Sequence, residues 1–115
     1  MEQIKAWERF MKVLYISAEC KPFSKVGGVA DVTAELPPFL KEQGIDIEIV
    51  TPLYGSTKRE LYSRSPSEEY RVRYQGRDET VEVYRGEIKG VPVNLLKNST
   101  SVSYTHLTLP TILLV

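Results

Sequence analysis

A glycine pair between an apolar run and a helical pattern constrains this chain more than any other feature. Residues 13–16 read Val-Leu-Tyr-Ile, and residues 25–32 read Lys-Val-Gly-Gly-Val-Ala-Asp-Val. This order predicts a strand, a loop and the start of a helix. Adjacent glycines let a backbone turn tightly and approach a ligand, and the first N–H groups of a helix attract anions. With Lys25 beside them, they suit a diphosphate or a sugar phosphate. Ordinary turn chemistry explains the same glycines, so geometry alone leaves both interpretations open.

The segments around this loop predict a strand and a helix. Residues 12–17 have the apolar, β-branched composition of a buried parallel strand, and residues 18–28 form a long loop. A helix is predicted over residues 28–43, ended by Gly44. Its expected apolar stripe consists of Val29, Val32, Thr33, Leu36, Phe39, Leu40 and Gln43. Pro37 and Pro38 fall inside the helix and should kink or divide it, because proline lacks an N–H group.

A second strand completes the unit. Isoleucines alternate with acidic residues over residues 45–52, which predicts a strand closed by Pro52. Strand, helix and strand together form a right-handed βαβ unit, the start of a doubly wound sheet. Ligands bind such sheets beyond the carboxyl ends of the strands. Both the loop that carries Glu19 and residues 53–55 should emerge at that edge.

The remainder of the chain changes to an antiparallel pattern. Residues 56–69 are polar, with a short helix expected at residues 57–63. Alternating residues then predict strands at 70–74, 79–88 and 91–96, joined by turns at 76–78 and 89–90. The predicted fold class is α/β: a partial Rossmann-like parallel sheet with an antiparallel β-meander. Its core should be thin, with one face of the sheet uncovered.

Charge and cysteine content exclude several functional classes. Fifteen basic residues balance fifteen acidic ones, so nothing favours a nucleic acid or an anionic membrane as partner. No apolar run is long enough to span a bilayer, for which about 20 residues are needed. The single cysteine, Cys20, cannot form an internal disulfide, which fits the reducing cytoplasm. A lone thiol with no histidine nearby is expected to be inert.

The residues from Met11 to Leu40, MKVLYISAECKPFSKVGGVADVTAELPPFL, carry a family resemblance. They are similar to the N-terminal region of bacterial glycogen synthases and plant-type starch synthases, retaining glucosyltransferases with two Rossmann-like halves. The shared pattern is a strand, a Ser-Glu pair, Lys-x-Gly-Gly-Val-Ala-Asp-Val and a Leu-Pro in the helix. The similarity continues more loosely to Asn98. One departure is Val26, where the family usually has threonine.

This resemblance implies roles for particular residues. Lys25 matches the lysine that contacts the phosphates of a nucleotide-glucose donor, and Gly27 and Gly28 match the glycines that admit the diphosphate. Glu19 and Asp31 match acidic positions on the glucose and acceptor side of the cleft. The implied reaction transfers glucose from ADP-glucose, or UDP-glucose in some relatives, to the non-reducing end of an α-1,4-glucan with retention. No catalytic residue, metal or cofactor is assigned to this chain, and the nucleotide sugar is a substrate.

The resemblance also divides the chain. Residues 1–10 are interpreted as an N-terminal extension, residues 11–98 as part of the synthase N-terminal catalytic domain, and residues 99–115 as a tail outside the family pattern. Family members are several hundred residues long, so we expect an enzyme fragment that is inactive by itself. A non-catalytic module that binds a sugar phosphate or a glucan is the alternative. A flavodoxin-like domain without a sugar role is a third interpretation, and it needs about five parallel strands.

Overall fold

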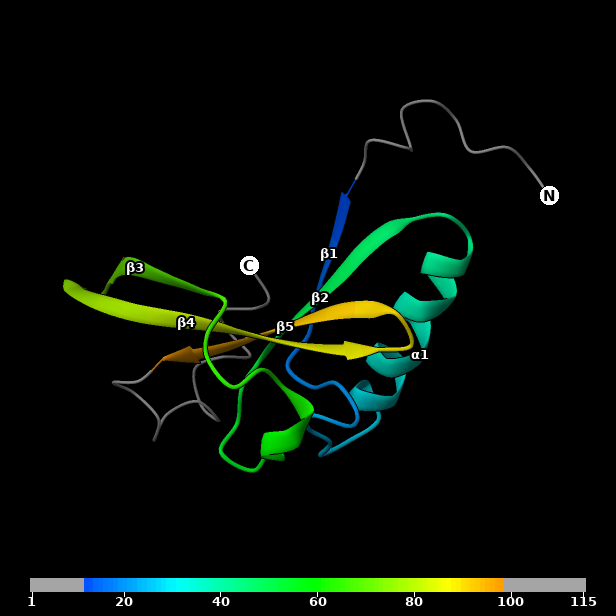
Figure 1. Ribbon diagram of the computed structural model, residues 1–115, viewed down its shortest axis with the longest axis horizontal. Helices are drawn as coiled ribbons and strands as arrows, with labels where there is room; N and C mark the ends of the chain where they lie inside the picture. Colours follow the sequence, from blue (N-terminus) through cyan, green and yellow to red (C-terminus); the bar gives the residue numbers. More distant parts are fainter. Residues whose placement is uncertain (1–11, 99–115) are drawn as a thin grey trace.

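One mixed five-stranded sheet carries a single long helix on one of its faces (Figure 1). The computed structural model describes residues 12–98, so the expected N-terminal extension and the tail lie outside the described residues. The elements, in chain order, are β1 (Lys12–Ile16), α1 (Val29–Glu42), β2 (Asp46–Pro52), the short 3-10 helix η2 (Arg59–Leu61), β3 (Glu68–Tyr74), β4 (Arg77–Ile88) and β5 (Val91–Asn98).

The strand order β1-β2-β5-β4-β3 joins the predicted βαβ unit to the predicted meander in one sheet. β1 pairs with β2 in parallel, as expected, with Val13 opposite Ile47. β5 pairs with β2 in parallel as well, with Ile49 opposite Val93. The meander is therefore attached through its last strand, which becomes the third parallel strand. The sequence did not predict this non-local pairing, and it gives β5 a central place.

Two tight turns build the antiparallel part. Gln75 and Gly76 join β3 to β4, and Lys89 and Gly90 join β4 to β5. All four residues have a positive φ, which is 52° at Gln75, 77° at Gly76, 49° at Lys89 and 85° at Gly90. Consecutive positive φ values belong to the turns whose twist matches that of two paired strands. The second turn lies where the sequence predicted it, and the first begins one residue earlier.

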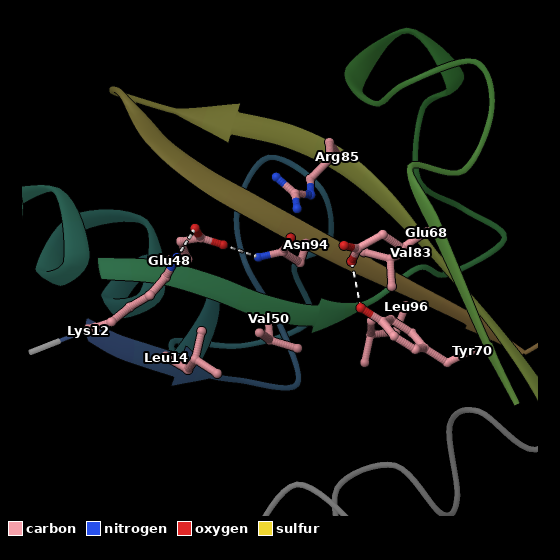
Figure 2. A pocket seen from close by; sticks show the side chains of 10 residues that line it. All are labelled: Lys12, Leu14, Glu48, Val50, Glu68, Tyr70, Val83, Arg85, Asn94 and Leu96. Atoms are coloured by element: carbon pink, nitrogen blue, oxygen red, sulfur yellow. Dashed lines mark hydrogen bonds and ion pairs between the residues drawn. The ribbon is translucent and has the colours of Figure 1, made fainter. Parts of the chain in front are cut away.

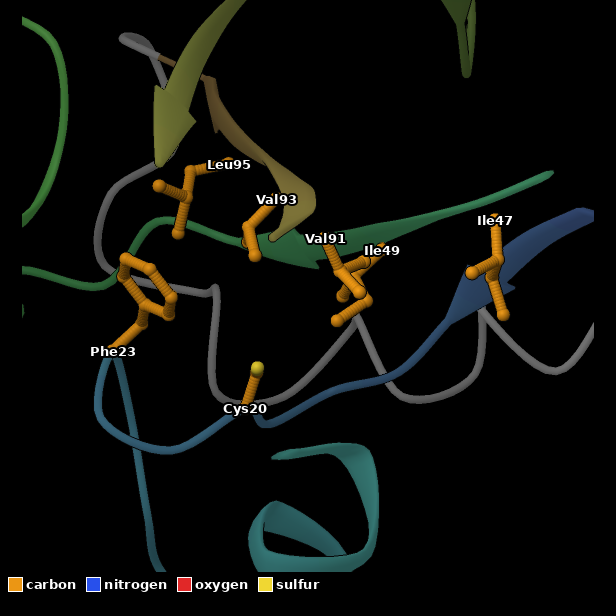
Figure 3. Packing of buried hydrophobic residues seen from close by; sticks show 7 residues of the cluster. All are labelled: Cys20, Phe23, Ile47, Ile49, Val91, Val93 and Leu95. Carbon is orange, nitrogen blue, oxygen red and sulfur yellow. The ribbon is translucent and has the colours of Figure 1, made fainter. Parts of the chain in front are cut away.

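The hydrophobic core lies between the sheet and the segment that contains α1 and the loop before it (Figure 3). Isoleucines of β2 and alternate residues of β5 point to the same side, where they meet two loop side chains. The buried cluster consists of Cys20, Phe23, Ile47, Ile49, Val91, Val93 and Leu95. Each strand contributes every second residue, because successive side chains of a strand point to opposite faces. The core thus fixes the loop against the carboxyl half of the parallel strands.

The expectation that the first strand is buried is wrong. β1 is the edge strand of the sheet, and its residues alternate between half-buried and exposed. Leu14 and Ile16 remain 56% and 49% exposed on the face away from α1. The sequence pattern could not reveal this, because a continuous apolar run does not say how many faces are covered. Among residues 12–98, α1 packs on only one face of the sheet, in agreement with the predicted uncovered face.

The expected buried stripe of α1 is also mostly wrong. The helix buries Ala30, Thr33, Ala34, Pro37 and Pro38. Of the predicted stripe, only Thr33 is buried, whereas four larger apolar residues are at least 40% exposed: Val29, Val32, Leu36 and Phe39. Small side chains on the inner face allow the helix backbone to lie close to the sheet. The larger residues form a second apolar face that points outward.

The two prolines do not divide the helix. α1 runs without a break from Val29 to Glu42 with Pro37 and Pro38 inside it, both buried. Each proline removes one backbone donor, and the packing of both rings against the protein offsets part of that loss. Gly44 follows the helix with a φ of 96°, which confirms the predicted glycine terminator. The expected helix at residues 57–63 is shorter than predicted and comprises only η2.

Candidate functional site

The loop between β1 and α1, residues 17–28, lies at the carboxyl edge of the parallel strands, as the sequence predicted. Hydroxyl groups of three residues from other segments help to hold it there, in addition to backbone hydrogen bonds from Ser17 to Val50 and from Lys21 to Ala30. The Thr33 hydroxyl of α1 lies 2.9 Å from Ser17 Oγ, at the end of β1. The Tyr54 hydroxyl donates to the carbonyl of Ala18 at 3.0 Å, and the Thr57 hydroxyl donates to the carbonyl of Phe23 at 3.0 Å. Residues 53–57 therefore support the loop from the neighbouring strand end.

The carboxylate of Glu19 crosses the loop and binds two of its backbone amides. Glu19 Oε2 accepts from the N–H of Val26 at 3.0 Å, and Oε1 accepts from the N–H of Gly27 at 3.2 Å. One amide binds each oxygen, as in charge-assisted recognition of an anion by backbone donors. In this structure an anion already occupies the glycine loop, and that anion belongs to the protein itself.

Lys25 lies at the same loop and is paired with Asp31. Its Nζ donates to Asp31 Oδ2 at 2.7 Å and to the carbonyl of Gly27 at 3.3 Å. The Nζ of Lys21 is 3.9 Å from the other carboxylate oxygen. The hydrogen bond from Lys25 lowers the pKa of Asp31 below its ordinary value. The structure thus brings Lys25, Gly27 and Asp31 together at the first turn of α1.

Two further backbone donors at this helix end are open. Within residues 12–98, neither the N–H of Gly28 nor the N–H of Val29 has a hydrogen-bond partner. No side chain caps α1, whose N-cap residue is Gly28. Unpaired amides at a helix start, together with the helix dipole, favour an anion. The loop therefore combines two occupied amides, two open amides and one lysine.

The glycines at positions 27 and 28 are not required by the local fold. Neither has a positive φ, and a Cβ atom at either position would meet no other atom within 4 Å. The chain does bend and turn at residues 26–28, as predicted, but without a backbone conformation that only glycine adopts. Open space in front of both residues leaves room for a ligand to approach the backbone, which was the second predicted reason.

Cys20 has the inert character that the sequence predicted. Its side chain is completely buried in the core, and burial raises the pKa of the thiol to about 11. A thiol with such a pKa is almost fully protonated at neutral pH and is a poor nucleophile. Among residues 12–98, no group of three or more His, Cys, Asp or Glu side chains could hold a metal ion.

A hollow, which the sequence did not predict, lies on the face of the sheet opposite α1 (Figure 2). It has a volume of about 470 Å³ and is lined by Lys12, Leu14, Glu48, Val50, Glu68, Tyr70, Val83, Arg85, Asn94 and Leu96. Glu48 accepts from Lys12 at 2.7 Å and from the Asn94 side chain at 2.9 Å. These partners lower the pKa of Glu48. Polar alternation along β2 and β5 was the only sequence signal for this face.

A parallel βαβ unit with a lysine and a glycine pair at its carboxyl edge is the arrangement of α/β domains that bind phosphorylated ligands. A family model described as "Starch synthase catalytic domain" matches residues 12–108. This chain therefore belongs to the starch synthase catalytic domain family. The family assignment confirms the resemblance seen in the sequence and replaces the flavodoxin-like interpretation.

Individual relatives agree with this assignment. The chain is 37% identical over 98 residues to a glycogen synthase of Geotalea daltonii, covering 84% of this chain and 20% of the relative. It is 39% identical over 85 residues to a glycogen synthase of Gloeobacter violaceus, covering 74% and 18%. The solved catalytic domain of starch synthase IV from Arabidopsis thaliana, bound to ADP and acarbose, matches with a TM-score of 0.71 and 26% identity over 81% of this chain and 19% of that one.

The chain therefore spans about a fifth of the length of these proteins. The fold class predicted from the sequence is confirmed by the match to the Arabidopsis domain. The division into residues 1–10, 11–98 and 99–115, and the roles of the five site residues, stay predictions. Within residues 12–98, no helix is both long and apolar enough to cross a membrane.

Proposed function

We propose that this chain forms part of the N-terminal half of a cytoplasmic glycogen or starch synthase. The complete enzyme transfers glucose from ADP-glucose, or UDP-glucose, to the non-reducing end of an α-1,4-glucan with retention. The observation that carries the proposal is the loop of Lys25, Gly27 and Gly28 at the carboxyl edge of the sheet, in a chain of this family. The related Arabidopsis domain was solved with ADP bound, which supports an adenine nucleotide in the donor.

In this proposal the loop stabilises the leaving diphosphate. The ammonium group of Lys25 supplies a positive charge, and the open amides of Gly28 and Val29 supply fixed dipoles. Groups of this kind stabilise charge that develops in the transition state, so their work is electrostatic rather than acid–base. Glu19 and Asp31 border the same loop, where they are proposed to face the glucose and the acceptor.

We further propose that the isolated chain binds donor but does not turn it over. It spans about a fifth of its relatives, and the outer face of α1 exposes Val29, Val32, Leu36 and Phe39. A helix that is apolar on both sides is typical of a position inside a larger protein. Mixing the chain with ADP-glucose and maltoheptaose should yield no ADP above the blank. Measurable turnover would contradict this part of the proposal.

Calorimetry with ADP tests the role of the loop directly. We expect saturable binding to the 115-residue chain and loss of at least about tenfold in affinity in Lys25→Ala, because a phosphate loses its charged hydrogen-bond donor. Lys41→Ala is the matched control, since Lys41 is an exposed lysine in the last turn of α1, at the end of the helix away from the loop. Equal losses in both variants, or none in Lys25→Ala, would refute the assignment of the loop.

A further inference from the structure

The charged groups of the glycine loop are already bound to one another. We propose that the ligand-free loop caps itself: Glu19 occupies the amides of Val26 and Gly27 in place of a diphosphate, while Asp31 holds Lys25. This inference rests on the proposed function, because it concerns the affinity of the same site. It gives both carboxylates a role in the ligand-free state. The resemblance to the family implies for them only a position on the glucose and acceptor side of the cleft.

The contacts of Glu19 resemble those of a bound anion. Both carboxylate oxygens are used, each by a different amide of consecutive residues, at 3.0 Å and 3.2 Å. Consecutive backbone N–H groups that converge on an anion form a phosphate-binding concavity in many loops. A diphosphate that uses these two amides must first displace the Glu19 side chain. While the carboxylate stays in place, its charge repels the incoming phosphate.

The contact of Asp31 acts on the lysine in the same way. Lys25 Nζ is 2.7 Å from Asp31 Oδ2 and also donates to the Gly27 carbonyl. Both side chains of this ion pair are 45% exposed. Ligand binding must exchange the carboxylate partner of Lys25 for a phosphate oxygen. Because the pair is solvated, the exchange costs little, and the effect on affinity is a moderate one.

Release of the two carboxylates has a second consequence. Glu19, near the start of the loop, and Asp31, in the first turn of α1, converge on residues 25–27. Once displaced by a diphosphate they stay beside the loop as free anions. The same residues can therefore cap the empty loop and border the sugar in the occupied one.

The test compares ADP binding by Glu19→Gln, Asp31→Asn and the unsubstituted chain, measured by calorimetry. Each substitution removes one internal anion and keeps the shape of the side chain. We expect affinity for ADP to rise about two- to fivefold in each variant, the effect of removing an exposed charged contact. The double variant should depart from the product of the two changes, since both carboxylates belong to one hydrogen-bond network that includes Gly27. Glu35→Gln, an exposed glutamate in the middle of α1, controls for the change in net charge.

A second measurement without ligand tests the capping contact itself. In ¹H–¹⁵N spectra, Glu19→Gln should shift the amide signals of Val26 and Gly27, and Glu35→Gln should leave them in place. Unshifted signals would overturn the capping inference. Equal or weaker ADP binding in Glu19→Gln and Asp31→Asn would also overturn it, while binding by the unsubstituted chain would leave the proposed function intact. If neither the chain nor any variant binds ADP, the proposed function of the loop fails as well.

Discussion

The two ends of the sheet differ in what covers them. β2 and β5 carry five of the buried residues beneath α1 and the loop: Ile47, Ile49, Val91, Val93 and Leu95. β3, at the far edge, has no buried residue at all. Figure 1 shows the corresponding arrangement, with α1 beside β2 and β5 and the turn between β3 and β4 far from the helix.

The two ends of the sheet are therefore held in place by different interactions. At the covered end, side-chain burial fixes the strands and the loop relative to one another, and apolar burial is the main favourable term in folding. In the hairpin, order comes from backbone pairing along β3 and β4 and from the turn at Gln75 and Gly76. The candidate site belongs to the covered end, so its geometry should depend on the core, including the contact of Phe23 with Gly86 of β4, and scarcely on β3.

The largest expected effect is on the covered end. Ile49→Ala removes a fully buried side chain of β2 and leaves a cavity, which should cost about 2–5 kcal/mol of unfolding free energy. Urea denaturation of the 115-residue chain, followed by circular dichroism, measures this loss. A loss below about 1 kcal/mol would mean that the core around Ile49 is loosely packed, since surface substitutions already have effects of that size.

The next effect tests how firmly the site loop is tied to the sheet. A Cβ atom at Gly86 of β4 would lie 2.7 Å from Phe23 Cε1 and 2.9 Å from the Leu61 carbonyl oxygen. Gly86→Ala must therefore displace the Phe23 ring of the loop, and we expect a loss of about 1–3 kcal/mol in unfolding free energy. Gly55→Ala is the matched control, because a Cβ there meets nothing within 4 Å. Similar losses in both variants would show that Phe23 does not anchor the loop.

Local patterns predicted the elements of both ends. The βαβ unit followed from an apolar run, a helical period and an alternating run, and both hairpin turns followed from their glycines. The neighbours of β5 were not predictable in this way. Its alternation fits any position in a sheet, and the choice of β2 as its partner depends on contacts between residues far apart in the chain, such as Ile49 with Val93.

The face of α1 that packs on the sheet shows a second limit. The helix has one apolar face of large residues and one of small residues, and sequence period alone favours the larger. The structure buries the small face, including Ala30 and Ala34, because the helix lies against the strands of the core. Hydrophobicity ranks residues by transfer free energy and contains no information on how closely two backbones approach.

For the candidate site, the sequence predicted which residues take part. It did not predict which hydrogen bonds and ion pairs they form with one another. Lys25, Gly27 and Glu19 do lie on one loop, and Asp31 joins them from the first turn of α1. Which carboxylate binds the lysine and which binds the amides depends on the path of the loop backbone, which no residue pattern specifies. The pairing of Asp31 with Lys25 and of Glu19 with the backbone amides is therefore a property of the three-dimensional structure.

A smaller effect concerns the uncovered face near β1. Hydrogen bonds from Lys12 and Asn94 lower the pKa of Glu48 from its ordinary value of 4.5. A carboxyl whose pKa is lower in the folded state stabilises the fold above its unfolded pKa. That contribution is lost as pH falls through the folded value. We expect Glu48→Gln to cost less than about 1 kcal/mol at pH 7, because the Lys12 partner is largely exposed.

The pH dependence of this difference is the sharper measurement. Unfolding free energies of the chain and of Glu48→Gln should converge as pH falls below about 4.5, where the native carboxyl becomes protonated. Glu69→Gln on the exposed hairpin is the control. A gap between the chain and Glu48→Gln that stays constant down to the acid end would show that the Lys12–Glu48 contact does not stabilise the fold.

The smallest effect is expected in the hairpin, and a matched pair of valines makes it informative. Val72 lies in β3 and is 42% exposed, whereas Val93 lies in β5 and is fully buried. Removing the same two methyl groups should cost about 1.5–3 kcal/mol at Val93. At Val72 the cost should be about 0.5 kcal/mol or less, as for other surface positions. ADP affinity should also be unchanged in Val72→Ala, because Val72 lies in β3, at the edge of the sheet away from the core that holds the loop with Lys25. Equal destabilisation by the two substitutions would mean that β3 is held by side-chain packing, and the contrast between the two ends of the sheet would no longer explain where the site is fixed.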